Sequence, residues 1–254
     1  MDFNDNTKEA EFRTKVRKFL DENAQRRGEV IKTPTTAGAP ESVSGEKAAN
    51  DALMKAKEWQ KKKAEAGLAA IIWPKEFGGY GGSPIEQVIY QQEEHNYFVH
   101  SGYFEIGIGM LGPTMMVWGK DEDKKKYLPK MLTGEEIWCQ LFSEPAAGSD
   151  LAGIKMKAEK DGSDWILNGQ KVWTSGAHLS DYGMIVARSD PNAVKHKGLT
   201  YFFLDMKTPG IEVKPIKQIS GTAHFNEVFF NDVRIPDSQR LGEEGEGWKV
   251  ALTT

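Results

Sequence analysis

The stretch WILNGQKVW, residues 165–173, decides the fold class, because it consists of two runs of β-forming residues around an Asn-Gly pair. Asn168-Gly169 between such runs is the strongest short signal for a β-hairpin. Further short, β-rich segments bounded by turn residues follow at 182–190, 199–206, 211–219 and 224–236. Strands without intervening helices predict an antiparallel sandwich or barrel in this half of the chain.

The first half of the chain predicts helices instead. Asn6 with Glu9 three residues later is typical of a helix start, and apolar residues recur behind it at helical spacing. Ser83-Pro84-Ile85-Glu86 is a second start, in which serine caps and proline takes the first helical position. The segments expected to be helical or helix-turn beyond the first are 46–66, 84 onward, 101–118 and 121–132, the last ending at Gly134. Residues 32–45, rich in Pro, Gly, Ser and Thr, predict a surface loop.

These patterns predict an α+β fold with a helical domain at 1–134 and an antiparallel β-barrel-like domain at 135–242. The remaining segment, 243–254, contains EGEGWKVALTT and resembles the first turns of another apolar helix. A helix of two turns is marginal without packing partners. We therefore expect that the sequence stops inside an element and that a third domain is missing.

Bulk composition excludes several classes of protein. Lys and Arg total 33 against 37 Asp and Glu, so a net charge of −4 gives no general attraction to nucleic acid or to an anionic membrane. The single cysteine, Cys139, cannot form an internal disulfide or a thiolate metal cage. The N-terminus is not a secretory signal, and no run approaches about 18 uncharged apolar residues. We expect a reduced, cytoplasmic protein without a membrane or nucleic-acid partner.

Three kinds of site are considered for the stretch QLFSEPAAGSD, residues 140–150, and its surroundings: a nucleophilic serine, a metal site and a phosphate loop. A nucleophilic serine requires Gly-x-Ser-x-Gly, but here the second glycine comes two residues late and no histidine is marked as the base. No histidines stand at metal-ligand spacing, so no metal site is expected. FGGYGGS, residues 77–83, lacks the Gly-Lys-Ser/Thr ending of a phosphate loop and predicts a tight turn.

A cofactor cradle explains the stretch better. Small residues around Pro145 and Gly148 let backbone approach a flat ligand, and Ser143 and Ser149 add hydroxyls that suit an isoalloxazine edge. In KVWTSGAH, residues 171–178, tryptophan offers a stacking face beside two hydroxyls. Each motif alone is typical of a turn or of a core tryptophan. Together they favour a cradle.

The chain resembles the acyl-CoA dehydrogenase family of flavoproteins. The resemblance is carried by CQLFSEPAAGSD, WILNGQKVWTSGAH and HFNEVFFNDVRIP with LGEEGEGWKVAL, and in the helical half by WPKEFGGYGG and KKKYLPKMLTGE. It runs nearly end to end, apart from 32–45. It implies a helical N-terminal domain, a β-barrel-like middle domain and a C-terminal four-helix bundle. We expect this chain to lack the bundle.

The resemblance also implies roles for residues in an FAD site. Ser143 would lie at the pyrimidine edge of the flavin, Trp173 beside the ring system and Ser175 towards N5, where the family often has threonine in place of either serine. Gln140 departs from the aromatic residue that some members carry. The cofactor-binding residues that we expect are Gln140, Leu141, Phe142, Ser143, Gly148, Ser149, Trp173, Thr174 and Ser175.

The substrate implied by the resemblance is an acyl-CoA thioester. Ser149 would also lie near its phosphopantetheine, and the loop of Lys195-His196-Lys197 could meet its nucleotide end, although surface charge alone also explains these lysines. The substrate residues that we expect are therefore Ser149 and His196.

The implied reaction is α,β-dehydrogenation to the trans-2-enoyl-CoA. A carboxylate takes the α-proton, the β-hydride passes to FAD, and the electrons pass to an electron-transfer flavoprotein. The family's base is a glutamate of the C-terminal bundle, which would fall after Thr254, so we expect this chain to be inactive alone. The resemblance also implies that the full protein is a homotetramer. A flavin oxidase or monooxygenase on the same fold, a non-catalytic hetero-oligomer subunit and a nucleic-acid-binding relative remain as alternatives.

Overall fold

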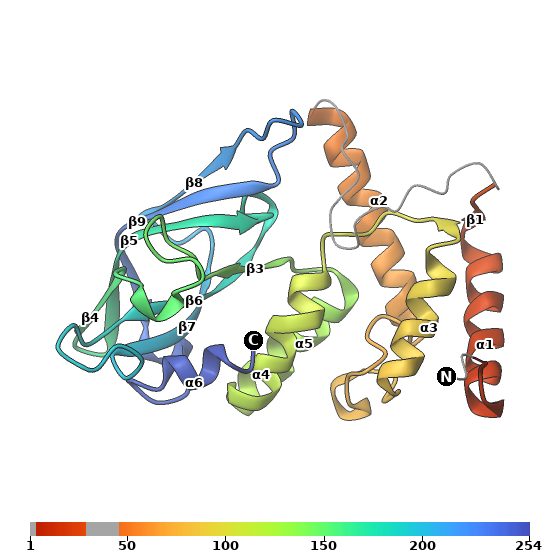
Figure 1. The fold of residues 1–254 in the computed structure, drawn as a ribbon, viewed down its shortest axis with the longest axis horizontal. Coiled ribbons are helices and arrows are strands. Elements are labelled where there is room, and N and C mark those ends of the chain that lie inside the picture. Colours follow the sequence, from red (N-terminus) through yellow and green to blue (C-terminus); the bar gives the residue numbers. More distant parts are fainter. Residues whose placement is uncertain (1–3, 29–45) are drawn as a thin grey trace. The chain divides into compact units, whose positions relative to one another are not determined.

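The structure is a computed structural model that describes residues 4–28 and 46–254, with the side chains of 46–48 left out (Figure 1). The loop predicted at 32–45 lies outside the described residues. The chain divides into two compact units, one of Met1–Tyr103 with Leu132–Glu135, the other of Phe104–Met131 with Glu136–Thr254.

Among the described residues, the first unit is built on three α-helices and three short segments of other structure. Its elements are α1 (Thr7–Asn23), β1 (Gln25–Arg26), α2 (Glu46–Glu65), the 3-10 turn Lys75–Phe77, α3 (Pro84–Glu94) and β2 (Tyr97–Phe98). Both predicted helix starts are confirmed as capping boxes. The Asn6 side chain accepts from the Glu9 amide at 3.0 Å, and the Ser83 hydroxyl accepts from the Glu86 amide at 3.2 Å.

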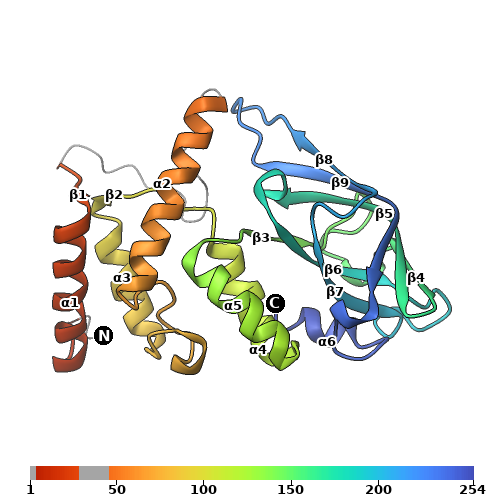
Figure 2. The same cartoon turned by 180° about the vertical axis from the view of Figure 1, so that it is seen from behind.

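An apolar core joins these helices. Phe12, Val16 and Leu20 recur on one face of α1 and are buried, which is the stripe that the sequence predicts. Helices α1 and α3 lie side by side (Figure 2). The core is completed by Trp59, Leu68, Ile71, Ile89, Tyr90 and Tyr97.

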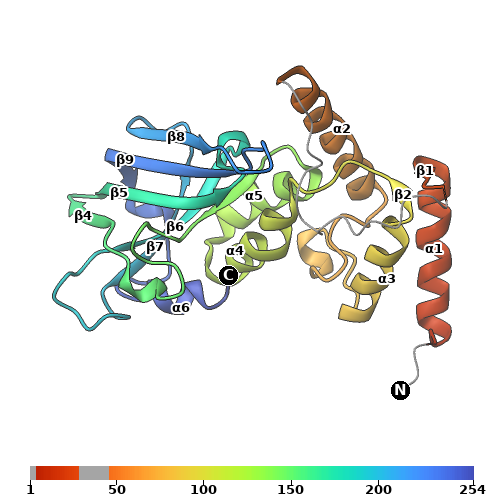
Figure 3. The same ribbon diagram turned by 45° about the horizontal axis from the view of Figure 1, so that its top comes forward.

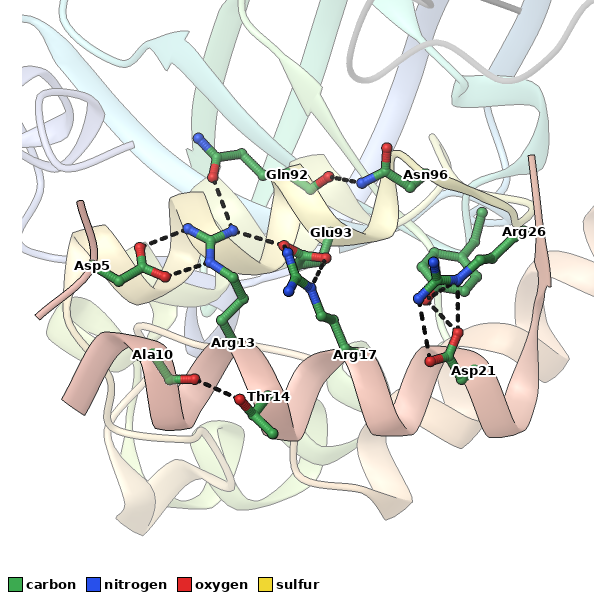
Figure 4. A network of polar contacts seen from close by, with 11 residues as sticks. Asp5, Ala10, Arg13, Thr14, Arg17, Asp21, Arg26, Gln92, Glu93 and Asn96 are labelled. Carbon is green, nitrogen blue, oxygen red and sulfur yellow. Dashed lines mark hydrogen bonds and ion pairs between the residues drawn. The ribbon is translucent and has the colours of Figure 1, made fainter. Parts of the chain in front are cut away.

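A network of charges links the outer sides of α1 and α3 (Figure 4). The guanidinium of Arg13 donates to Asp5 at 2.8 Å and to Glu93 at 2.7 Å, and Arg17 donates to the other oxygen of Glu93 at 2.8 Å. Gln92 accepts a further bond from Arg13 at 3.2 Å. We call Asp5, Arg13, Arg17 and Glu93 the helix-edge cluster.

The glycines of FGGYGGS form the tight turn that the sequence predicts. Gly78 has φ of 83° and ends the 3-10 turn, and Gly81 has φ of 71°. A Cβ on Gly79 would lie 2.1 Å from the carbonyl oxygen of Trp73. The turn therefore needs glycine for chain geometry, without any ligand.

The second unit contains helices and one sheet. The predicted helix-turn at 101–118 is a π-helical stretch, Gly107–Leu111, followed by α4 (Gly112–Trp118), and the predicted surface helix is α5 (Asp121–Thr133) with Gly134 at φ of 74°. The final helix, α6 (Gly247–Ala251), lies against β7 and β6. The strands are β3 (Trp138–Leu141), β4 (Lys157–Asp161), β5 (Asp164–Ser175), β6 (Tyr182–Arg188), β7 (Leu199–Asp205), β8 (Ile211–Ile216), β9 (Phe225–Pro236) and β10 (Arg240–Leu241).

The strands form one open sheet in the order β10-β7-β6-β4-β5-β9-β8, with β3 beside β6 (Figure 3). The barrel-like expectation is corrected in two respects. Strand β8 has no partner beyond β9, so among the described residues the sheet does not close, and β3 runs parallel to β6 while β4 meets β6 in parallel at Lys157 and Arg188. The remaining neighbours are antiparallel, and of these pairs β4 and β5 are joined by a two-residue turn.

The Asn168-Gly169 hairpin prediction is wrong. Both residues lie inside β5, and the actual two-residue turn is Gly162-Ser163, between the paired residues Asp161 and Asp164. Asn168 instead holds a bulge of β9, because its side chain donates to the Asp232 carboxylate and accepts from the Asp232 amide, each at 2.9 Å.

Gly169 is required by a close approach within the sheet. It has φ of 147°, and a Cβ there would lie 3.0 Å from Cα of Met156. Packing therefore explains the glycine that the local pattern assigns to a turn.

The sheet has its own apolar core, which includes Trp165, Leu167, Ile185, Phe202 and Phe230. Trp165 and Phe202 meet edge to face at 5.2 Å between ring centres. Within residues 4–28 and 46–254, no helix is long and apolar enough to cross a bilayer. In the same residues, no group of three or more His, Cys, Asp or Glu side chains could hold a metal ion.

Candidate cofactor site on the sheet

A short loop after β3 is fastened to the surface of β5. The carbonyl of Ser143 accepts from the Val172 amide at 2.9 Å. Glu144 and Ala147 exchange two backbone hydrogen bonds of 2.9 and 3.0 Å, which close the Pro145-Ala146 turn. We call residues 142–147 the cradle loop. Its conformation is fixed by backbone pairing on both of its halves.

A buried ion pair lies beneath the cradle loop. Lys171, on β5, is 0% exposed, and its ammonium donates to Glu144 Oε1 at 2.9 Å, to the Phe142 carbonyl at 3.0 Å and to the Val186 carbonyl at 2.8 Å. Glu144 accepts two further bonds, from the amides of Lys155 and Met156, at 2.7 and 3.1 Å. The pair is fully hydrogen-bonded, which a buried charge requires.

Burial decides the electrostatics of this pair. Desolvation lowers the pKa of Lys171 to about 8, although the charge and hydrogen bond of Glu144 act in the opposite direction. Glu144 already accepts from one ammonium and two amides, so its oxygens are committed to the loop. This glutamate is therefore placed to hold backbone in position and not to accept a proton from a substrate.

Trp173 stands on a bulge of β5 at the side of the cradle loop. Val172 and Trp173 together oppose one residue of β9, and Trp173 has φ of 59°, a left-handed conformation that is rare for a bulky residue. Its indole is 58% exposed and meets only the Phe225 ring, edge to face at 6.0 Å. The bulge turns a large flat side chain out of the sheet.

The next residue, Thr174, has an unusual hydroxyl. It is 2% exposed, and its Oγ1 is the one fully buried side-chain oxygen or nitrogen without a hydrogen-bond partner in the described part of the chain. Its carbonyl accepts from the buried amide of Asn226 at 2.9 Å, and Oδ1 of Asn226 lies 3.1 Å from Nδ1 of His178. A buried, unsatisfied hydroxyl costs free energy, so it indicates a place that a ligand or ordered water can complete.

Besides Trp173 and Thr174, the other seven residues expected to bind the cofactor fall into three groups. Gln140 and Leu141 end β3, but Leu141 is 0% exposed in the sheet core, so only its backbone is available to a ligand. Phe142 and Ser143 are half-buried on the cradle loop, and Ser175 is half-buried at the end of β5. Gly148 and Ser149 are exposed.

The expected substrate residues lie on two neighbouring loops. Asp150, next to Ser149, accepts from the Lys195 ammonium at 2.6 Å, and this contact joins the segment after the cradle loop to the β6–β7 loop. His196 is exposed and packs edge to face on Trp248 at 4.6 Å between ring centres. The structure thus brings Ser149 and His196 to linked loops.

Comparison with known proteins identifies the family of the chain. The model of the acyl-CoA dehydrogenase N-terminal domain matches residues 6–135, and that of the middle domain matches 139–233. The chain belongs to the acyl-CoA dehydrogenase family. Members of this family are FAD-dependent oxidoreductases that act on acyl-CoA.

Individual relatives place the chain further within the family. Acyl-CoA dehydrogenase IpdE1 of Mycobacterium tuberculosis is 38% identical over 244 residues, which are 96% of this chain and 61% of that protein. The solved structure of the steroid ACAD Tcur3481-Tcur3483 matches with a TM-score of 0.79 and 30% identity, over 100% of this chain and 62% of that chain. The ChsE4-ChsE5 complex from Mycobacterium tuberculosis matches with a TM-score of 0.77 and 29% identity, over 99% and 60%. The chain spans about three fifths of the length of these relatives.

The residues of this acyl-CoA dehydrogenase chain fit a flavin. Beyond the orphan hydroxyl of Thr174, the hydroxyls of Ser143 and Ser175 make no hydrogen bond within the described residues, so three of them remain to serve a ligand rich in carbonyls and ring nitrogens. Trp173, which is exposed, directly precedes Thr174 and Ser175 on β5. Small side chains and fixed backbone complete the approach of a flat ring.

Sequence reasoning missed the supports of this site. Lys171 follows the polar Gln170 in NGQKVW and gives no local sign of burial, and the sequence marks neither Arg188 nor Asn226 as a site residue. Only the strand pairing brings Lys171 against Glu144, 27 residues earlier in the chain. Alternation along 164–175 carried a partial signal, because Trp165, Leu167 and Lys171 fall on the buried face.

Proposed function

We propose that this chain forms the FAD-binding and acyl-CoA-facing part of an enzyme that dehydrogenates an acyl-CoA at its α and β carbons. The observation that carries the proposal is a set of three hydroxyls without hydrogen-bond partners among the described residues, those of Ser143, Thr174 and Ser175, on the cradle loop and on the end of β5 that carries the exposed indole of Trp173. In this proposal residues 1–134 and 135–242 are the two domains. When bound, FAD supplies the acceptor for the hydride.

The chain's own residues orient the cofactor. Ser143 donates to the pyrimidine edge of the ring, Ser175 reaches towards N5, and Trp173 packs beside the ring system. Backbone of Gln140, Leu141 and Phe142, with Gly148 and Ser149, lines the approach. The Glu144–Lys171 pair keeps the cradle loop in place at a depth where water cannot compete for its hydrogen bonds.

The proton is handled by a group outside the cradle. Glu144 accepts from Lys171 and from two backbone amides, so it is unsuited to remove an α-proton. We infer that the carboxylate base belongs to the family's C-terminal bundle, so that residues 1–254 alone would be inactive and would bind FAD weakly. Ser149 and His196 face the CoA part of the substrate.

The names of the relatives suggest a substrate class and an assembly. One solved relative is called a steroid ACAD, and another is the complex of two different chains, ChsE4 and ChsE5. We extend both properties to the whole protein as part of the proposal: a CoA thioester with a steroid skeleton as substrate, and an oligomer in which a second chain participates. An electron-transfer flavoprotein would be the acceptor of the electrons that the bound FAD takes up.

Anaerobic titration tests this function. The full-length protein reconstituted with FAD should lose the 450 nm absorption of the oxidised flavin when it is mixed with a steroid-side-chain CoA thioester, as bleaching at that wavelength reports flavin reduction. Ser175→Ala should slow this bleaching by about 10²-fold or less, since a single hydrogen bond to the reacting ring is lost. Absence of FAD binding, or bleaching by neither this thioester nor octanoyl-CoA, would reject the proposal.

Oxygen consumption separates the dehydrogenase from an oxidase on the same fold. In air, a dehydrogenase should reduce a purified electron-transfer flavoprotein with little peroxide. Stoichiometric peroxide would instead assign the chain to the oxidases.

A further inference from the structure

Arg188, the last residue of β6, links two loops through their backbone. Its Nε donates to the Ile154 carbonyl at 2.9 Å and its Nη2 to the Ala152 carbonyl at 2.7 Å. Nη1 and Nη2 both reach the Lys195 carbonyl, at 3.2 Å each. One planar guanidinium therefore spans segment 152–154 and the β6–β7 loop, a geometry that a lysine cannot reproduce.

In the described part of the chain, the side chain of Arg188 forms its hydrogen bonds to these backbone carbonyls alone. Within residues 4–28 and 46–254 its guanidinium forms no ion pair, whereas Arg13 and Arg234 each bind two carboxylates. Its acceptors are backbone carbonyl oxygens of the 3-10 turn Leu151–Gly153, of Ile154 directly after that turn, and of the β6–β7 loop. Charge-assisted hydrogen bonds of this kind are roughly twice as strong as neutral ones, so the contact fixes both loops.

Other contacts fasten the same two loops. The Lys195 ammonium pairs with Asp150 at 2.6 Å on the outside. At the neck of the β6–β7 loop, the amides of Ser189 and Asp190 both donate to the Gly198 carbonyl, at 2.9 and 3.2 Å. A Cβ on Gly198 would lie 2.2 Å from the Asp190 carbonyl oxygen and 2.9 Å from Nη1 of Arg188, so the neck closes tightly over the guanidinium.

We propose that Arg188 is a positioning residue for the acyl-CoA: it joins segment 149–154 and the β6–β7 loop into one rigid surface that carries Ser149 and His196. This inference rests on the proposed function, in which those two residues face the CoA part of the substrate. Arg188 itself touches neither substrate nor flavin. Its side chain makes no hydrogen bond to the cradle loop, so its effect on the substrate is separable from any effect on the flavin.

The expected signature is a change in substrate affinity at constant flavin properties. Arg188→Met removes all the side-chain donors and keeps most of the volume, so the two loops lose their link. A misplaced binding surface commonly costs between ten- and a hundredfold, and we expect the Kd of CoA and of octanoyl-CoA to rise by about that factor. Arg188→Lys should rescue this loss only in part, because an ammonium serves one or two carbonyls.

The matched control is Arg234→Met. Arg234 also lies on the sheet and its guanidinium also bridges two acceptors, Asp161 and Asp164, but these flank the Gly162-Ser163 turn. It should leave the Kd of both ligands within about twofold of the unchanged protein. A second variant, Asp150→Asn, weakens the outer link between the loops and should raise the Kd by less than Arg188→Met does.

Calorimetric titration of the FAD-loaded full-length protein measures these Kd values, and the flavin absorption spectrum and reduction potential are recorded for each variant. A higher Kd for Arg188→Met and a smaller increase for Arg188→Lys, with spectrum and potential unchanged, support the inference. An unchanged Kd in Arg188→Met overturns it. Loss of FAD together with CoA from both Arg188 variants and from Asp150→Asn also overturns it, since Arg188 would then serve general folding.

Failure of the proposed function is recognised separately. If the unchanged protein binds FAD but neither CoA nor octanoyl-CoA, the substrate class is wrong, and the positioning role falls with it. If the unchanged protein binds both ligands and the Arg188 variants leave the Kd values unchanged, as Arg234→Met does, the function stands. This inference alone is then rejected.

Discussion

Two charged clusters of similar composition stand in opposite environments. In the Glu144–Lys171 pair, the side chains are 8% and 0% exposed. In the helix-edge cluster, Arg13 is 19% and Arg17 is 54% exposed, while Glu93 is 8% exposed (Figure 4). The first cluster fixes a loop and the second joins two helices.

The two clusters differ in whether a charged group keeps another partner when one member is removed. Glu93 receives two arginines and Arg13 pairs with two carboxylates, so Glu93 keeps an arginine when Arg17 is lost, and Arg13 keeps Glu93 when Asp5 is lost. Lys171 has one carboxylate and no water to replace it. A single buried ion pair can therefore contribute more to stability than several partly exposed ones, because removal of one partner from a buried pair leaves the other charge buried and unpaired.

Glu144→Ala should have the largest effect. It leaves the Lys171 ammonium buried without its carboxylate and removes the acceptor of two loop amides, which should lower the free energy of unfolding by about 3–5 kcal/mol. Urea denaturation of the FAD-free protein measures this. Adding Lys171→Met should recover part of the loss, and the exposed pair member Glu212→Ala is the control, with about 0.5 kcal/mol or less. Equal losses of unfolding free energy for Glu144→Ala and Glu212→Ala would remove the contrast between buried and exposed ion pairs.

The second largest change in unfolding free energy is expected when the pH is raised and the Lys171 ammonium of the buried pair loses its proton. Burial lowers the pKa of Lys171 from 10.5 to about 8, so between these values the unfolded chain binds more protons than the folded one. Stability that depends on this group therefore increases as pH rises from about 8 to about 10.5, by at most about 1.4 kcal/mol per pH unit. The difference in unfolding free energy between the unchanged protein and Lys171→Met isolates it. A difference that decreases over this window would contradict the assigned direction.

Glu93→Gln should have an intermediate effect. Burial alone would raise the pKa of Glu93, but hydrogen bonds from Arg17 and Arg13 outweigh it and hold that pKa below its ordinary value. The substitution keeps the shape and some hydrogen bonds, so a loss of about 1–2 kcal/mol in unfolding free energy is expected. Thermal unfolding measures it. A loss as large as that of Glu144→Ala would show that the helix edge behaves as a buried site.

Arg17→Met should have the smallest effect. Arg17 is the most exposed of the four members, and Arg13 still pairs with Glu93 when Arg17 is lost. A cost of about 0.5 kcal/mol or less is expected, and it should shrink further as salt rises from 0.05 to about 1 M, because exposed charges are screened. Unfolding at both salt concentrations measures it. A cost that grows with salt would place Arg17 in a different kind of contact.

The sequence predicted the features that depend on neighbours along the chain. Both capping boxes, at Asn6 and Ser83, are local hydrogen-bond patterns three residues long, and both are confirmed. The helix that ends at Gly134 and the glycine turn at 77–83 follow from the same short-range rules. The order of strands along the chain was also visible, because each strand carries its own β-forming run.

Features that depend on distant partners were not accessible. Asn168-Gly169 matches the turn pattern as well as any hairpin does, but its partners are Asp232 and Met156, and these decide its place within β5. The parallel pairing of β3 with β6 leaves no trace in either strand. Lys171 and Arg188 are lysine and arginine of ordinary appearance, and only the assembled sheet gives each its carbonyl acceptors.

The ends of the open sheet limit how copies of this chain can meet. An exposed edge strand is a template on which another chain can add a strand. Here one end is β10, which is only two residues long, and the other is β8, which carries Lys214 and Pro215. A proline offers no amide donor, and a lysine at the edge repels a copy of itself. Association by sheet extension, the first step of many aggregates, is therefore opposed at both ends, and ordered contacts between subunits are left to side chains.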